Sequence, residues 1–231
     1  MNRKLIPALL IGLALAAFAC NTKESEPEKA DFYGDFFVRY LVPEKELKAY
    51  ASFSQGDSVQ ISKAVALEGG LTFQGSAMEA HDLQGQQIRY FYRAQADYKA
   101  PYTFKGKTPA GKDFEFTLNM SSIGKFSIKE GVISKSKGMT LVIENGTLTK
   151  EETVVMLFTN PADNKSYTII DQGPYAGDEH NIPATALQSL PKGKLQLYLV
   201  KKQQQLIENA TISSTASAEF YTDMIEVTVT D

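Results

Sequence analysis

Apolar and polar side chains alternate along most of the chain from Asp31 to Asp231. In the clearest runs, residues 36–40, 114–118, 195–199 and 225–229, every second side chain points to one face of an extended strand. Gly, Pro, Asn and Asp separate these runs, which is typical of turns between short strands. No stretch of twelve residues carries an apolar stripe at helical spacing. The pattern therefore predicts an all-β protein, and strands of five to ten residues favour a β-sandwich.

Three local features can be placed within this pattern. The runs 101–104 and 113–118 flank the turn-rich segment 105–112, which predicts a hairpin of two aromatic strands. Asn145-Gly146 follows the apolar run 139–143 and suits a type I′ turn, although the next residues are polar. The segment 183–190 begins with Pro and is followed by Pro191, so it predicts one short helical turn.

The body of the chain, residues 31–231, is long enough for either one large sandwich or two small ones, and we favour two. The segment 121–130 is polar, contains Gly and lies near the middle of the body. A boundary there gives domains 31–125 and 126–231, each the size of an immunoglobulin-like β-sandwich. The single Cys excludes an intramolecular disulfide, so such domains would depend on their apolar cores alone.

The N-terminus carries the sharpest motif. Arg3 and Lys4 precede the apolar run Leu5–Ala19, which is too short to span a bilayer but suits an export signal. Its end, Ala17-Phe18-Ala19-Cys20, resembles the lipobox of bacterial lipoproteins. That resemblance implies a cleaved signal peptide over 1–19, lipidation of Cys20, a lipidated N-terminus with a flexible tether over 20–30, and attachment to a membrane outside the cytoplasm. An ordinary secretory signal and an uncleaved anchor are the alternatives.

The mature chain resembles Bacteroidota lipoproteins with tandem immunoglobulin-like domains. The supporting fragments are VRYLVPEKELKAYASFSQGD, ALEGGLTFQGSAM, YTFKGKTPAGKDF, LVIENGTLTKEETVVMLF and LQSLPKGKLQLYLVKK. Lys23-Glu24 and the acidic residues behind it resemble the export signal of surface lipoproteins in that phylum. The resemblance implies an outer-membrane protein at the cell surface, with the periplasmic face as the alternative, and supplies no active site. Asp57-Ser58-Val59 is similar to the O-glycosylation motif of these proteins, which makes Ser58 a possible glycosylation site.

Composition and motif searches exclude several functions. A net charge of −3 argues against nucleic-acid binding, and one Cys with two His leaves little for a transition-metal site. No nucleotide-binding, serine-hydrolase or zinc-protease motif occurs, so no cofactor, metal or catalytic residue is expected. His81 is expected at the surface. The most site-like loop is polar and Gly-containing, and it also holds His180. Its candidate oxygen ligands for calcium or another ligand, with ordinary turn chemistry as the alternative, are Asp171, Asp178, Glu179 and Asn181.

The run Tyr90-Phe91-Tyr92 must place aromatic rings on both faces of a strand. A ring outside the core is suited to stacking on a sugar, with packing between sheets or domains as the alternative.

From these observations together we expect a non-enzymatic, membrane-anchored binding or interaction module whose partner is a glycan or an envelope protein. Candidate binding loops are 171–181 and 105–112. The alternative is a subunit similar to the fimbrillins, which assemble by strand exchange after cleavage at a basic residue, here Arg39. A hydrolase that uses Asp178 or Glu179 is a further alternative.

Overall fold

The computed structural model describes residues 31–208 and 211–231. The predicted signal peptide, Cys20 and the tether lie outside these residues. Within them the chain forms eighteen β-strands and two short 3-10 helices, η1 (Val59–Ile61) and η2 (Ala184–Leu187). None of the described helices is long and apolar enough to cross a membrane. The prediction of an all-β sandwich fold is confirmed.

Eleven of the described strands form one main sheet, whose central path is β11-β18-β16-β17-β1-β2-β7-β6. β13 pairs with β16 and β14, and β3 pairs with β2. Most neighbours in this sheet are antiparallel. Its strands are β1 (Phe32–Leu41), β2 (Glu46–Gln55), β3 (Lys63–Ala64), β6 (Glu79–Leu83), β7 (Gln87–Gln95), β11 (Ile133–Ser134), β13 (Glu152–Thr159), β14 (Ser166–Gln172), β16 (Gly193–Glu208), β17 (Ser213–Tyr221) and β18 (Ile225–Thr230).

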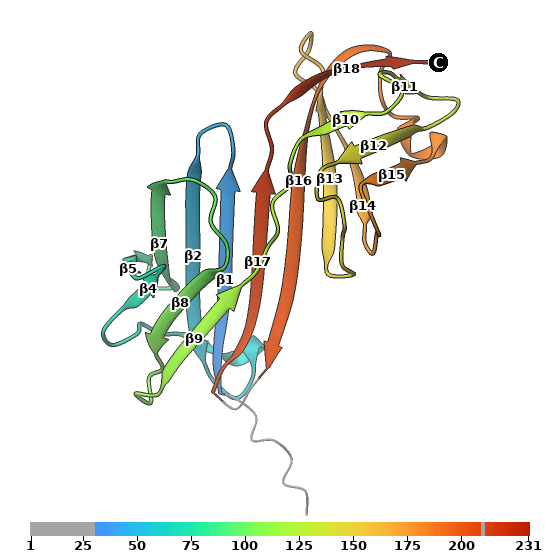
Figure 1. The fold of residues 1–231 in the computed structure, drawn as a ribbon. Coiled ribbons are helices and arrows are strands. Elements are labelled where there is room, and N and C mark those ends of the chain that lie inside the picture. The colour runs from blue at the N-terminus through green and yellow to red at the C-terminus, as the bar shows by residue number, and fades with distance from the viewer. Residues whose placement is uncertain (1–30, 209–210) are drawn as a thin grey trace, which may run out of the picture.

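Two smaller sheets pack on the main sheet and complete two sandwiches (Figure 1). The first comprises β5 (Ser76–Ala77), β4 (Leu71–Phe73), β8 (Tyr102–Lys107) and β9 (Asp113–Leu118). The second comprises β10 (Phe126–Ile128), β12 (Met139–Ile143) and β15 (Glu179–Ile182). In the first sandwich the ring of Phe36 lies 5.0 Å from Phe104 and 4.8 Å from Phe116. The buried apolar side chains of both sandwiches belong to one continuous core.

The two sandwiches share the main sheet. β1 runs parallel to β17, with Val38 opposite Ala218, and lies between β17 and β2. β16 pairs with β18 through its first residues and with β17 through its last ones. The main sheet therefore continues across the predicted boundary between 31–125 and 126–231. β17, which belongs to the second range, pairs with β1 and completes the sheet of the first sandwich. The pairing joins residues about 180 positions apart, which no local pattern encodes.

Two of the three local predictions are confirmed. β8 and β9 form the expected hairpin, with Tyr102 opposite Leu118. Residues 184–187 form the expected helical turn, as the 3-10 helix η2. The third prediction, a type I′ turn at Asn145-Gly146, is wrong, because Gly146 does not share the positive φ of Asn145 and the strands on either side do not pair. β12 pairs with β10 and β15, whereas the following strand β13 belongs to the main sheet. Asn145 does adopt a positive φ of 60°, and the turn carries the chain from one sheet of the sandwich to the other.

Candidate functional site

Both small sheets cover the same face of the main sheet, and we call its opposite face the open face. Because side chains alternate along a strand, the two faces can be assigned from burial. In β1, Phe36 and Val38 are fully buried in the core, whereas Phe37 and Arg39 are half-buried on the open face. In β16, Leu195, Leu197 and Leu199 point to the core in the same way. The open face therefore extends across both sandwiches.

Charged side chains form a row on the open face. The register places Lys202 of β16 opposite Glu219 of β17, and Glu219 beside Arg39 of β1. Arg39 Nη2 and Nε donate to Glu219 Oε2 at 2.7 and 3.1 Å, and Lys202 Nζ lies 3.0 Å from Oε1. Tyr221 Oη also donates to Glu219, at 2.9 Å. Burial raises the pKa of Glu219, but the hydrogen bonds from Lys202, Arg39 and Tyr221 together lower it below its ordinary value. Glu219 therefore holds three strands together as a carboxylate.

Aromatic rings form the next row. The centroid of Phe37 lies 5.8 Å from that of Tyr50, which lies 5.2 Å from that of Phe91 on β7. The guanidinium of Arg39 sits 5.2 Å from the Phe37 ring, and that of Arg89 sits 5.9 Å from the Tyr50 ring. Tyr90, the neighbour of Phe91, is buried in the core. The aromatic run 90–92 thus divides between the two faces, and Phe91 supplies a ring to the open one.

A shallow groove of about 900 Å³ runs along the open face. Its floor is β17, where Thr215 and Ser217 have small side chains, and its walls are the longer side chains of the neighbouring strands. The groove is thus a consequence of short hydroxyl side chains between long ones. Its principal lining residues are Lys202, Gln204, Leu206, Thr215, Ser217 and Phe37.

A second hollow of about 280 Å³ adjoins this groove, since Phe37 and Ser217 line both. Polar side chains inside it are already ordered by one another. Gln87 Nε2 donates to Ser52 Oγ at 3.0 Å, and Arg89 Nη2 donates to Gln87 Oε1 at 3.2 Å. Arg89 has no carboxylate partner within residues 31–208 and 211–231. The hollow therefore combines two aromatic rings, amide and hydroxyl groups, the Arg89 cation and the carboxylate of Asp35.

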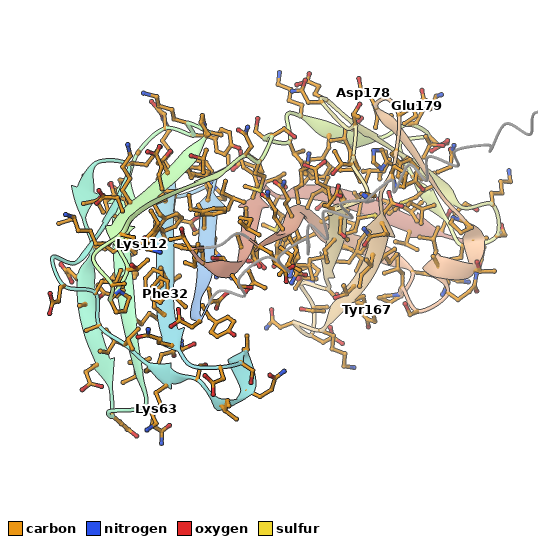
Figure 2. The ribbon with its side chains drawn as sticks, turned by 90° about the horizontal axis from the view of Figure 1, so that it is seen from below. Phe32, Lys63, Lys112, Tyr167, Asp178 and Glu179 are labelled. Carbon is orange, nitrogen blue, oxygen red and sulfur yellow. The ribbon has the colours of Figure 1, made fainter. Side chains whose placement is uncertain are left out.

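The sequence-predicted acidic loop does not form a ligand cage. Asp178 Oδ1 accepts the Gly146 N–H at 3.0 Å, and Glu179 Oε1 lies 2.7 Å from Lys129 Nζ. Asn181 Oδ1 accepts a hydrogen bond from Thr140 Oγ1 at 3.1 Å. Asp178 and Glu179 lie side by side at the margin of the second sandwich (Figure 2). In the part of the chain that the structure describes, no three His, Cys, Asp or Glu residues are grouped to hold a metal ion.

The remaining acidic candidate, Asp171, has a structural partner that the sequence did not predict. His180 lies on β15 and is fully buried, not exposed in a polar loop. Its Nδ1 lies 2.7 Å from Asp171 Oδ2 and its Nε2 lies 2.7 Å from the Gly146 carbonyl oxygen. The ring of Tyr175 stacks on the imidazole at 4.4 Å. Both imidazole nitrogens are thus engaged, and the cluster connects β14, β15 and the turn after β12.

Other predicted positions are all at the surface. Ser58 precedes η1 in a surface turn, is half-buried and makes no capping hydrogen bond. His81 lies on the edge strand β6 and is exposed, as expected. Arg39 lies inside the central strand β1, with its backbone between β17 and β2.

A buried ion pair that the sequence did not predict lies at the junction of the two sandwiches. Lys201 of β16 is fully buried, and its Nζ lies 2.9 Å from Glu152 Oε1. The same Nζ donates to Ser121 Oγ at 2.6 Å. Burial raises the pKa of the nearby Tyr98 to about 12, and the charge of Glu152 adds to the effect. The sequence does contain a signal for the burial of Lys201, because position 201 continues the alternating, core-facing series 195, 197 and 199.

Comparisons with known proteins add little. No protein-family model matches the chain. No curated protein matches it either. Among solved structures, the chain is similar to the first three fibronectin domains of chicken CNTN1. The identity is 10%, the match covers 84% of this chain and 67% of that one, and the TM-score is 0.20. At that score the similarity carries no argument about function.

Proposed function

We propose that this chain is a lipid-anchored, extracytoplasmic binding protein that holds a glycan on the open face of its main sheet and catalyses no reaction. The observation that carries the proposal is the groove over β17, which joins the hollow beside Tyr50. A long open groove suits a polymer better than a small molecule, which prefers an enclosed pocket.

The chemistry of the groove favours a carbohydrate. A sugar ring presents hydroxyl groups at its edge and C–H bonds on its faces. Gln204, Thr215 and Ser217 offer amide and hydroxyl partners for the former, and the rings of Phe37 and Tyr50 offer apolar surface for the latter. The charged groups Lys202 and Glu219 already pair with one another, and the hollow that contains Arg89 is also lined by Asp35. The lining therefore carries charges of both signs and does not favour a highly charged ligand.

The membrane anchor rests on the lipobox at Cys20. The described body begins at Asp31, so eleven residues separate it from the proposed lipid. Export to the cell surface is part of the same proposal. It would bring the groove to environmental glycans, whereas a periplasmic orientation would leave envelope polymers as ligands.

The position of Arg39 argues against the alternative function, a fimbrillin-like subunit that exchanges strands after cleavage at this residue. Cleavage after Arg39 would detach most of β1 from the middle of the main sheet, together with the fully buried Phe36 and Val38. A protease would reach that backbone only if the sheet opened. The hydrolase alternative has no support at Asp178 or Glu179, because each is engaged with a protein partner.

The test combines location with binding. Protease treatment of intact cells should digest the wild-type body, and Cys20→Ser should fail to reach the membrane fraction. The purified wild type should bind at least one oligosaccharide on a glycan array. Calorimetry with that oligosaccharide should show a loss of affinity of about tenfold or more for Ser217→Tyr, which fills the groove floor.

A matched control is available on the other side of the first sandwich. Thr117 is an exposed strand residue on β9, away from the open face, so Thr117→Tyr adds the same side chain and should bind as the wild type does. Equal loss in both variants, or a folded wild type that binds no glycan, would contradict the proposal.

A further inference from the structure

The short helix η1 exposes two large apolar side chains to solvent. Val59 is 60% exposed and Ile61 is 65% exposed, and none of the three η1 residues is buried. Single exposed apolar residues are common on protein surfaces, but two on one helical turn of three residues are not explained by core packing. A third, Leu206 near the end of β16, is 65% exposed. It lines a hollow of about 350 Å³ together with Val59. Val59 and Leu206 thus lie at one hollow, and Ile61 follows Val59 by two residues in η1.

These apolar residues lie where the chain enters the folded body. The Asp31 carbonyl oxygen accepts the Gly56 N–H at 2.9 Å, and Asp31 Oδ2 accepts a hydrogen bond from Gln55 Nε2 at 3.2 Å. Phe32 is opposite Gln55 in the sheet. The start of β1 is therefore fastened three residues before η1 begins. Figure 1 shows the start of β1, η1 and the end of β16 at the same end of the molecule.

Chain length places this end close to the anchor of the proposed function. The eleven residues from Cys20 to Ala30 span at most about 40 Å when fully extended. The sixteen residues of β16 alone extend over about 50 Å from the far end toward this one. A lipid on Cys20 therefore holds the η1 end of the body nearest to the bilayer.

We propose that the η1 end is a membrane-docking surface, with Val59 and Ile61 inserted into the interfacial region of the lipid bilayer. This inference rests on the lipid anchor of the proposed function. Lys63, just after η1, is exposed and makes no ion pair with any described residue, so it is available to lipid phosphates. Asp57 offsets that charge nearby, which makes the apolar contact the main attraction. In this orientation the strands of the main sheet extend away from the bilayer, and the groove on the open face does not face the membrane.

The absence of Trp from the chain gives a clean test. Ile61→Trp and Val132→Trp each create a protein with one tryptophan. Val132 is 41% exposed and precedes β11, at the opposite end of the molecule, so it is the matched control (Figure 1). The full lipidated chain is purified and reconstituted into vesicles of phosphatidylethanolamine and phosphatidylglycerol, with or without brominated acyl chains, which quench tryptophan on contact.

Docking predicts that brominated lipid reduces the tryptophan fluorescence of the Ile61→Trp variant by about twofold or more. The emission of that variant should also shift to the blue on vesicles, while the emission of the Val132→Trp variant stays unchanged. Vesicles that carry the Ile61→Trp protein without quenching it would overturn the docking surface and leave the anchor intact. Equal quenching of the two variants would show a body lying flat on the bilayer and would also overturn it. A chain that does not float with vesicles would overturn the anchor and the docking together.

Discussion

Lys201 Nζ lies 2.9 Å from Glu152 Oε1, and both side chains are buried where the two sandwiches meet. Ser121, on the connection between the sandwiches, accepts a second hydrogen bond from the same ammonium group. The second oxygen of Glu152 accepts the Thr149 N–H at 2.9 Å. The pair thus ties β13, β16 and the connecting segment to one another.

Removing one partner of this pair should be far more harmful than removing both. Lys201→Ala leaves Glu152 buried without its cation, which should cost about 3–5 kcal/mol of unfolding free energy. Lys201→Met combined with Glu152→Gln should recover much of that loss, because no uncompensated charge remains. Urea unfolding followed by circular dichroism measures both. Equal stability of the single and double variants would show that the pair is not electrostatically coupled.

The Glu219 hydrogen bonds predict a specific acid dependence. Because the pKa of Glu219 in the folded protein is below its ordinary value of 4.5, its stabilising contribution is complete above that pH. The contribution is lost as the pH falls through the folded pKa. Thermal unfolding between pH 7 and 3 should therefore show a smaller acid-induced loss for Glu219→Gln than for the wild type. Parallel curves for the two proteins would refute this assignment.

Two buried tyrosines should respond differently to loss of their hydroxyl groups. Tyr102 Oη is buried with no partner among the described residues, whereas Tyr90 Oη accepts the Leu67 N–H at 2.7 Å. Tyr102→Phe should leave stability unchanged or raise it. Tyr90→Phe leaves a buried N–H unpaired and should cost about 1–3 kcal/mol. The midpoints of denaturant unfolding of the two variants give the comparison directly, and the reverse order would be evidence against it.

The acidic candidate residues of the loop 171–181 should stabilise the fold and should not bind calcium. Millimolar calcium or a chelator should leave the unfolding temperature unchanged, because Asp178, Glu179 and Asn181 each have a protein partner. Asp171→Ala should destabilise the protein by about 1–3 kcal/mol, since it leaves a ring nitrogen of the buried His180 without its acceptor. A calcium-dependent rise in unfolding temperature would reverse this interpretation.

Much of the local structure was predictable from the order of residues. The hairpin of β8 and β9 followed from two alternating runs around a turn-rich segment, and η2 followed from its flanking prolines. Both depend on interactions between residues close in sequence. The turn at Asn145 shows the limit, because the same local preference for positive φ serves a hairpin or a crossing between sheets. Which of the two forms depends on where the next strand finds its partner.

The candidate sites divide in the same way. The aromatic run 90–92 indicated that a ring would leave the core, and Phe91 does so. Its position beside Tyr50, and the groove beyond Phe37, depend on the registers of β7, β2, β1 and β17. The polar neighbours of His180 predict a loop, but His180 lies on a strand, where Asp171 and Gly146 engage its ring nitrogens inside the fold.

The sequence by itself determined that the body is all-β, because period-two alternation leaves a strand as the conformation that buries its apolar side chains. It also contains the motif Ala17-Phe18-Ala19-Cys20, on which the proposed lipid anchor rests. Only the tertiary structure decided that β1 lies parallel to β17, and that Lys201 and Glu152 meet in the interior. The physical reason is that alternation specifies which side chains of a strand face inward, whereas the choice of neighbouring strand depends on the whole sheet.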